Sequence, residues 1–265
     1  MSMFESDPYH RSIKAHDGPI LSVKLVGSDL LLIGTQDGFL IYESLSSLSE
    51  STSPSYSVPI GVASISAVSD TDFALGLSGN GSIIFFDLLK RNFTGTVKTP
   101  LTSVKCLQTD GRYLFAGGKG SADIYRIEMA TKSILDVWKT SGTETTSMSI
   151  DHRKNWIVAI TSGQQYKTHL NICCIHAFPI ADMSVEASTP LTGVSFTTDS
   201  RMVLSCFGPL QLEAKLDGVI STLPGVDFSG AGGVVVSSGF ILFFGLCAVV
   251  LLSPTDHTVK LKLGI

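Results

Sequence analysis

The chain has 265 residues and carries 19 Lys and Arg against 23 Asp and Glu, so its formal net charge is −4. A protein that binds nucleic acid through bulk charge needs a basic face to neutralise phosphates, so this balance disfavours direct nucleic-acid binding. Charged residues make up 16% of the chain and hydrophobic residues 44%, which excludes a disordered protein.

The N-terminal residues 1–14 mix acidic and basic side chains without the apolar run of a secretory signal. The five cysteines are an odd number, and their spacing is not typical of zinc sites. We therefore predict free thiols in a reducing compartment, no metal site, and a cytoplasmic or nuclear protein that is not secreted. The cysteines are Cys106, Cys173, Cys174, Cys206 and Cys247.

Short apolar runs recur along the chain in groups of three, separated by polar or glycine-rich turns, and predict β-strands. In chain order the runs cover 20–25, 30–34 and 38–43, then 62–67, 73–77 and 82–87, then 102–107, 113–117 and 122–127, then 146–150, 156–160 and 170–175, then 191–196, 202–205 and 210–216. A fourth short run comes after four of the groups, at 56–58, 95–97, 134–138 and 183–186. The middle runs recur about 40–46 residues apart, as measured from Leu31, Phe73, Tyr113, Trp156 and Met202.

Four strands in a repeat of this length are typical of one blade of a β-propeller. We predict an all-β, single-domain propeller over residues 1–265, with six blades, or seven as the alternative. A sixth unit begins at Leu223, because residues 223–229 copy the pattern of residues 191–197. The rest of the chain divides either as one long blade or as one blade plus part of a seventh. The predicted blades cover 16–58, 59–98, 99–139, 140–187, 188–222 and 223–265.

Three short motifs resemble the WD-repeat family. His16-Asp17-Gly18 precedes the first strand, where that family often carries a Gly-His turn, and Phe86-Asp87 ends a third strand in the place of Trp-Asp. Residues 251–261 are similar to the family's strand, Asp turn and subsequent Thr-Val-Lys-Leu strand. The resemblance implies a closed ring, in which residues 11–15 form the outer strand of the last blade and residues 258–263 its inner neighbour. Such closure would remove an exposed sheet edge.

One apolar segment allows a different interpretation. Residues 228–255 contain no charged side chain, and residues 230–253 are long enough to cross a bilayer as a tail-anchoring helix. Lys260 and Lys262 beyond this segment oppose the positive-inside rule, and its glycines and β-branched residues are also typical of short buried strands. We favour strands and keep the membrane anchor as an alternative.

Hydrolases, kinases and dinucleotide enzymes carry characteristic motifs between a strand and a helix, and the sequence shows none of these motifs in that context. Two glycine clusters are interpreted as hairpin turns between second and third strands, where positive φ favours glycine. These clusters are Gly76, Gly79 and Gly81, and Gly117, Gly118 and Gly120. We predict a protein without enzymatic activity and without a cofactor.

The turns between second and third strands reach one face of a propeller and are our candidates for binding a partner protein. The candidate residues are Gln36, Asp37, Asn80, Lys119, Gln164 and Tyr166. Tyr166 lies in the longest of these turns, and tyrosine is enriched at energetically important interface positions.

The predicted function is a non-enzymatic protein-interaction scaffold that is one subunit of a multiprotein assembly. The low charge and the apolar C-terminal third favour this prediction, because such surface is costly to expose to water. One alternative is the tail-anchored membrane propeller. The other is an open propeller, similar to those of vesicle coats and nuclear pores, that a partner completes with a strand or blade.

Overall fold

The computed structural model describes residues 19–26, 30–44, 55–58, 60–151, 153–163, 167–178, 181–186, 191–196, 202–206, 211–214, 220–222, 231–237, 240–245, 248–252 and 259–264. Within these ranges the regular elements are β-strands, apart from one 3₁₀ turn, η2 (Ile175–Ala177).

The described strands form six consecutive four-stranded units, which we number in chain order. Unit 1 contains β1 (Ile20–Val26), β2 (Leu30–Thr35), β3 (Phe39–Ser44) and β4 (Ser55–Ser57). Unit 2 contains β5 (Val62–Ala67), β6 (Asp72–Leu77), β7 (Ser82–Asp87) and β8 (Asn92–Lys98). Unit 3 contains β9 (Ser103–Thr109), β10 (Tyr113–Lys119), β11 (Ile124–Glu128) and β12 (Ser133–Trp138).

The second half of the chain repeats this pattern. Unit 4 contains β13 (Glu144–Ile150), β14 (Trp156–Ser162), β15 (Thr168–Cys174) and β16 (Ala181–Glu186). Unit 5 contains β17 (Leu191–Phe196), β18 (Met202–Cys206), β19 (Gln211–Ala214) and β20 (Ile220–Thr222). Unit 6 contains β21 (Ala231–Ser237), β22 (Phe240–Gly245), β23 (Ala248–Leu252) and β24 (Val259–Gly264).

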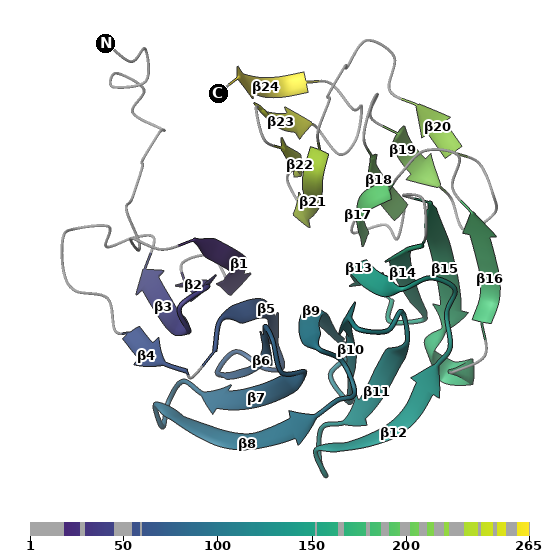
Figure 1. Cartoon of the computed structure of the whole chain (residues 1–265). Coiled ribbons are helices and arrows are strands. Elements are labelled where there is room, and N and C mark those ends of the chain that lie inside the picture. Colours follow the sequence, from purple (N-terminus) through teal and green to yellow (C-terminus); the bar gives the residue numbers. More distant parts are fainter. Residues whose placement is uncertain are drawn as a thin grey trace, which may run out of the picture.

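Each unit is an antiparallel meander in which consecutive strands are hydrogen-bonded neighbours. The first strands of the units lie toward the centre of the molecule and the fourth strands lie outside (Figure 1). Units 3 and 4 are joined into one curled sheet by a single pairing between Lys119 of β10 and Glu144 of β13. This radial arrangement of meanders is a β-propeller, as the repeat in the sequence predicts. The total number of blades stays a prediction.

A β-bulge recurs near the start of each first strand. The pairing register shifts between Ile20 and Ser22, Val62 and Ser64, Val104 and Cys106, Thr145 and Ser147, Leu191 and Gly193, and Ala231 and Gly233. A bulge leaves one residue unpaired and increases the local twist of the strand. The six units therefore share the same local distortion, although their sequences differ.

Small residues behind the bulge allow neighbouring units to pack closely. The Ser64 hydroxyl of β5 donates to the carbonyl oxygen of Val104 in β9 at 2.9 Å, and Ser22 of β1 makes the equivalent bond to Val62 at 2.9 Å. Ser64 pairs with Gly76 in β6, and a Cβ on this glycine would lie 2.8 Å from the Val104 oxygen. The glycine therefore leaves room for the backbone of the next unit.

This packing corrects part of our glycine interpretation. Gly79, Gly81 and Gly120 do adopt positive φ in the turns between second and third strands. The other members of the two clusters, Gly76, Gly117 and Gly118, lie inside second strands. Gly76 and Gly117 leave room for the next unit, whereas Gly118 leaves room for the backbone of the first strand in its own unit.

The hydrophobic core consists of clusters between adjacent units. Phe73 and Phe86 pack between units 1 and 2, and Leu114 packs between units 2 and 3. Trp138 is buried between units 3 and 4, and Trp156 packs against the cluster between units 4 and 5. Units 2, 3 and 4 each contribute to two clusters, one with each neighbour in the sequence, so none of these three units carries a complete core of its own.

The C-terminal segment contributes the four described strands of unit 6. The tail-anchor alternative predicts a helix over residues 230–253, but this segment contains β21, β22 and β23. Among the described residues, no helix is both long and apolar enough to span a membrane. β24 occupies the outer position of unit 6, so residues 11–15 paired to it would add a fifth strand. Residues 11–15 lie outside the described part of the chain, and their pairing stays a prediction.

Candidate interaction face

The turns between second and third strands and the connections between units lie at the same end of the units, which we call the connection face. In unit 3 the backbone N–H of Thr102, which precedes the first strand, donates to the carbonyl oxygen of Lys119 at 2.8 Å. In unit 2 the bond runs in the opposite direction, since the backbone N–H of Ser78 donates to the carbonyl oxygen of Gly61, also at 2.8 Å. In both units the end of the second strand is thus fixed beside the start of the first strand.

The structure places four of the six predicted interface residues on this face. Gln36 and Asp37 are exposed, and the backbone N–H of Gln36 donates to the Pro19 oxygen at 3.0 Å. Asn80 is exposed only in part, and its side-chain oxygen accepts the backbone N–H of Ser82 at 3.0 Å. Lys119 is exposed. Gln164 and Tyr166 lie outside the described residues, and the role of all six in binding stays a prediction.

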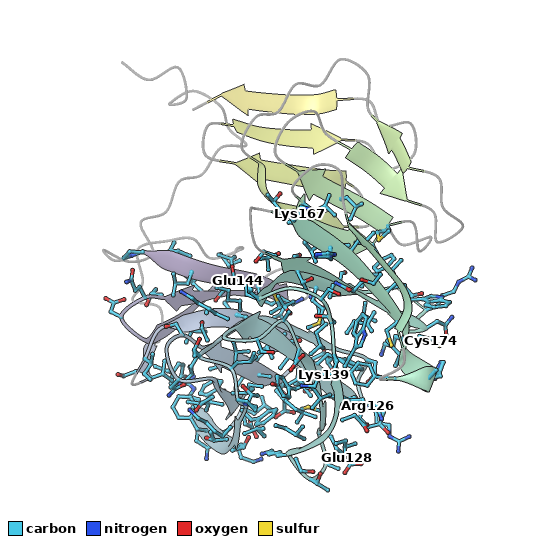
Figure 2. All side chains as sticks on the ribbon, turned by 45° about the vertical axis from the view of Figure 1, so that its right-hand side comes forward. Arg126, Glu128, Lys139, Glu144, Lys167 and Cys174 are labelled. Carbon is cyan, nitrogen blue, oxygen red and sulfur yellow. The ribbon has the colours of Figure 1, made fainter. Side chains whose placement is uncertain are left out.

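Further charged residues on the connection face form two ion pairs, which the polar turns in the sequence do not predict. Lys105, the unpaired residue of the unit 3 bulge, has its ammonium 3.1 Å from a carboxylate oxygen of Glu144 in unit 4. Lys139, at the start of the connection to unit 4, has its ammonium 2.6 Å from a carboxylate oxygen of Asp123. Figure 2 labels Lys139 and Glu144 on units 3 and 4. The hydrogen bond and charge of Asp123 raise the pKa of Lys139.

A signal in the sequence could have identified the position of Lys139 on this face. Lys98-Thr99 and Lys139-Thr140 lie at or just after the end of a fourth strand, one repeat period apart. In both units the threonine hydroxyl donates to a carbonyl oxygen in the turn between second and third strands, at 2.7 Å for Thr99 and 2.6 Å for Thr140. The Lys-Thr pair therefore marks the point where the chain leaves an outer strand and passes the turn.

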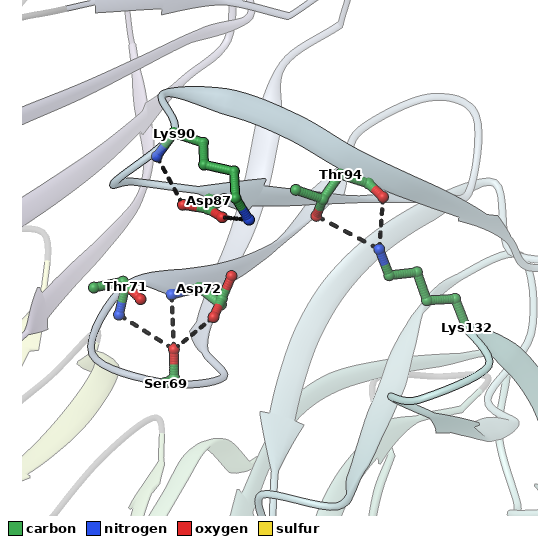
Figure 3. A network of polar contacts seen from close by, with 7 residues as sticks. All are labelled: Ser69, Thr71, Asp72, Asp87, Lys90, Thr94 and Lys132. Atoms are coloured by element: carbon green, nitrogen blue, oxygen red, sulfur yellow. Dashed lines mark hydrogen bonds and ion pairs between the residues drawn. The ribbon is translucent and has the colours of Figure 1, made fainter.

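The opposite ends of the units are closed by side-chain caps. Asp110 in unit 3 accepts the backbone N–H groups of Arg112 and Tyr113 at 2.8 and 2.7 Å. Ser69 in unit 2 occupies the corresponding position and accepts the N–H groups of Thr71 and Asp72 (Figure 3). These polar residues hold the turns between first and second strands, as expected for Asp and Ser in turns.

A second set of contacts at this end joins outer strands. Asp87, which we compared with the Asp of a Trp-Asp pair, ends β7 and accepts the backbone N–H of Lys90 at 2.9 Å and its ammonium at 2.7 Å. Lys132 reaches from unit 3 to the carbonyl oxygen of Thr94 in unit 2 at 2.7 Å (Figure 3). These contacts stabilise turns and unit packing. The membership of the WD-repeat family stays a prediction.

The described residues offer no cluster that suits a metal ion. Within this part of the chain, no group of three or more His, Cys, Asp or Glu side chains is arranged to hold one. Cys106 is buried, and burial raises the pKa of its thiol to about 12.

No protein-family model and no curated protein matches the sequence. The structure is similar to a chain of Kuenenia stuttgartiensis hydrazine synthase, with a TM-score of 0.77 and 12% identity over 92% of this chain and 80% of that chain. It is also similar to a chain of a mitotic checkpoint complex, with a TM-score of 0.71 and 13% identity over 93% of this chain and 77% of that chain. At these identities the likeness concerns the fold. The protein is therefore an all-β propeller, a fold that it shares with chains of an enzyme and of a checkpoint complex.

Proposed function

We propose that this propeller is a non-enzymatic interaction subunit of a multiprotein assembly and that it binds a partner through the connection face. The observation that carries the proposal is the alignment of exposed polar turns on one face, with their backbones fixed by hydrogen bonds between turn and connection. A preorganised surface loses little conformational freedom on binding. The likeness to a chain of a mitotic checkpoint complex supports an interaction role. We also propose that the protein acts in the cytoplasm or nucleus.

The test is affinity purification of the tagged full chain from its native cells without detergent, followed by size measurement and mass spectrometry. We expect a defined assembly well above the 28.2 kDa of the single chain. A variant with Asn80→Ala and Gln36→Ala should recover less of the partner, whereas Arg112→Ala and Arg153→Ala on the opposite face should recover it fully. Recovery of the wild-type chain as a monomer would overturn the proposal.

A second candidate function is suggested by the arrangement of the units. First strands contact one another in order from β1 through β5, β9, β13 and β17 to β21, but the described residues of β21 and β1 make no comparable contact. Ile20, Leu21 and Val23 of β1 are 50%, 41% and 57% exposed. Every other neighbouring pair of described units is packed through an apolar cluster or first-strand contacts. We propose that an apolar sheet of a partner protein fills the position between units 6 and 1.

Cysteine cross-linking distinguishes this candidate from a ring that closes on itself. The variant Leu21→Cys with Val234→Cys places thiols on β1 and β21, and Leu21→Cys with Ala63→Cys places them on the contacting strands β1 and β5. With a short bismaleimide and peptide mapping, we expect the isolated chain to cross-link only in the second variant. Equal cross-linking of both variants would show that the ring closes within the chain and would overturn the second candidate.

A further inference from the structure

The connection face between units 2 and 4 is basic, although the chain as a whole carries a net charge of −4. The carboxylates of Asp123 and Glu144 are each engaged by a lysine of this face, Lys139 and Lys105 respectively. The same face also carries Lys98 and Lys119, both exposed. Glu144 also pairs in register with Lys119, but its carboxylate lies 3.1 Å from the Lys105 ammonium. The four lysines described on this face therefore exceed these two carboxylates by two positive charges.

Comparison of units 2 and 3 shows why Lys98 is left unneutralised. Lys98 ends β8 and Lys139 comes directly after β12, and both precede a threonine that bonds to the neighbouring turn. In unit 3 the residue opposite the lysine is Asp123, whereas in unit 2 Lys98 pairs in register with Ser82. The ammonium of Lys98 instead donates to the backbone carbonyl oxygen of Asn80. Unit 2 thus has a lysine at the position that corresponds to Lys139, but no carboxylate at the position that corresponds to Asp123.

The segment between the two lysines is held by hydrogen bonds at both ends. At one end Thr99 donates its N–H and its hydroxyl to the Gly81 oxygen, at 3.0 and 2.7 Å. At the other end Thr102 donates its N–H and its hydroxyl to the Lys119 oxygen, at 2.8 and 3.0 Å. Lys98 and Lys119 therefore lie at the two ends of residues 99–102.

The length of this segment gives an upper limit to the spacing of the charges on a matching ligand. Four residue steps separate Lys98 from Thr102, so their Cα atoms lie at most about 14 Å apart. An extended peptide rises about 3.3 Å per residue. Two carboxylates up to about four positions apart along such a peptide fit within this limit. Pro100, which lies within residues 99–102, is exposed and belongs to the surface along which such a peptide would lie.

Building on the proposed function, we propose that Lys98 and Lys119 bind an extended acidic segment of a partner protein, with one carboxylate at each end of residues 99–102. Charge complementarity favours an acidic peptide. A nucleic acid is disfavoured because it carries phosphates at every step, and the net negative charge of the chain would repel it.

The test is selection of a phage-displayed library of random peptides on the intact wild-type chain. We expect enrichment of peptides with Asp or Glu up to about four positions apart, and selected peptides are measured with a fluorescein label by anisotropy. Lys98→Glu with Lys119→Glu should weaken binding at least about tenfold, as expected when two ion pairs become repulsive. Ser82→Asp, which supplies the missing carboxylate beside Lys98, should weaken it several-fold without removing either lysine. Thermal unfolding of each variant confirms that it is folded.

The matched control is Arg112→Glu with Arg153→Glu, which makes the same change in net charge on the opposite face. Retention of binding by this control supports the proposal, and an equal loss would show an effect of net charge alone and overturn it. Selection of peptides that are not acidic, or binding of labelled oligo(dT) that is lost with the two lysines, would also overturn it. None of these three results would overturn the proposed assembly, because that proposal fails only if the native chain is a monomer.

Discussion

Asp151 shows how one buried carboxylate determines a turn. Its side chain is 2% exposed and accepts the backbone N–H groups of Arg153, Asn155 and Trp156 at 3.2, 2.7 and 2.7 Å. The sequence predicts only a polar turn here, because the pattern does not show that the carboxylate turns inward.

Replacement of this carboxylate should destabilise unit 4. In Asp151→Ala the three N–H groups lose their acceptor, so we expect a loss of about 2–3 kcal/mol in the free energy of unfolding. The measurement is urea denaturation followed by tryptophan fluorescence. Asp110→Ala, which removes an acceptor of two N–H groups, should cost less. An equal or larger loss in Asp110→Ala would contradict the explanation.

Cys106 supplies a prediction about reactivity and pH. Because burial raises the pKa of its thiol to about 12, we expect it to resist N-ethylmaleimide in the native protein and to react after denaturation. The unfolded thiol releases its proton near its ordinary pKa of 9.0, so folding stability falls as the pH rises from there toward 12. Cys106→Ala should show a shallower fall in alkaline denaturation experiments. Identical slopes would contradict the assignment.

At the scale of elements, the contact between adjacent first strands depends on a serine and a glycine. A methyl group at Gly76 would meet the Val104 backbone oxygen at 2.8 Å and the Val104 side chain at 2.7 Å. The neighbouring unit would have to move, because a backbone carbonyl in a sheet cannot rotate away. Val104 is completely buried, so this movement would disturb the cluster between units 2 and 3.

We therefore expect Gly76→Ala to cost about 2–3 kcal/mol through overpacking. Ser64→Ala removes one hydrogen bond to Val104 and should cost about 1 kcal/mol. Thermal unfolding by calorimetry measures both. Gly79→Ala is a useful comparison, because Gly79 has φ +84° but more space around it. The stability that this variant loses should come from backbone strain and not from a clash between units. A neutral Gly76→Ala would contradict the packing argument.

At the scale of the whole molecule, units contact mainly their neighbours in the sequence. Effects of mutations in separated units should therefore add. For Ser64→Ala in unit 2 with Asp151→Ala in unit 4, we expect the combined loss to equal the sum of the single losses within about 0.5 kcal/mol. Chemical denaturation of the two single variants and the double variant provides the measurement. A larger deviation would show coupling through the ring.

The sequence by itself determined the strands and their grouping. Alternating and apolar runs placed β5 at Val62–Ala67 and β17 at Leu191–Phe196 without error, because period-two hydrophobicity and turn residues are local signals. The repeat period then indicated a propeller. Where periodicity was weak, as in the apolar C-terminal segment, hydropathy alone left strands and a membrane helix both open.

Only the tertiary structure decided which residues act together. Gly76 lies in a strand because the next unit approaches it, and Glu144 meets Lys105 because two units curve toward each other. Lys98 differs from Lys139 through the residue across the sheet, Ser82 in place of Asp123. Such relations depend on register and on the packing of units, which bring together residues that no local pattern connects.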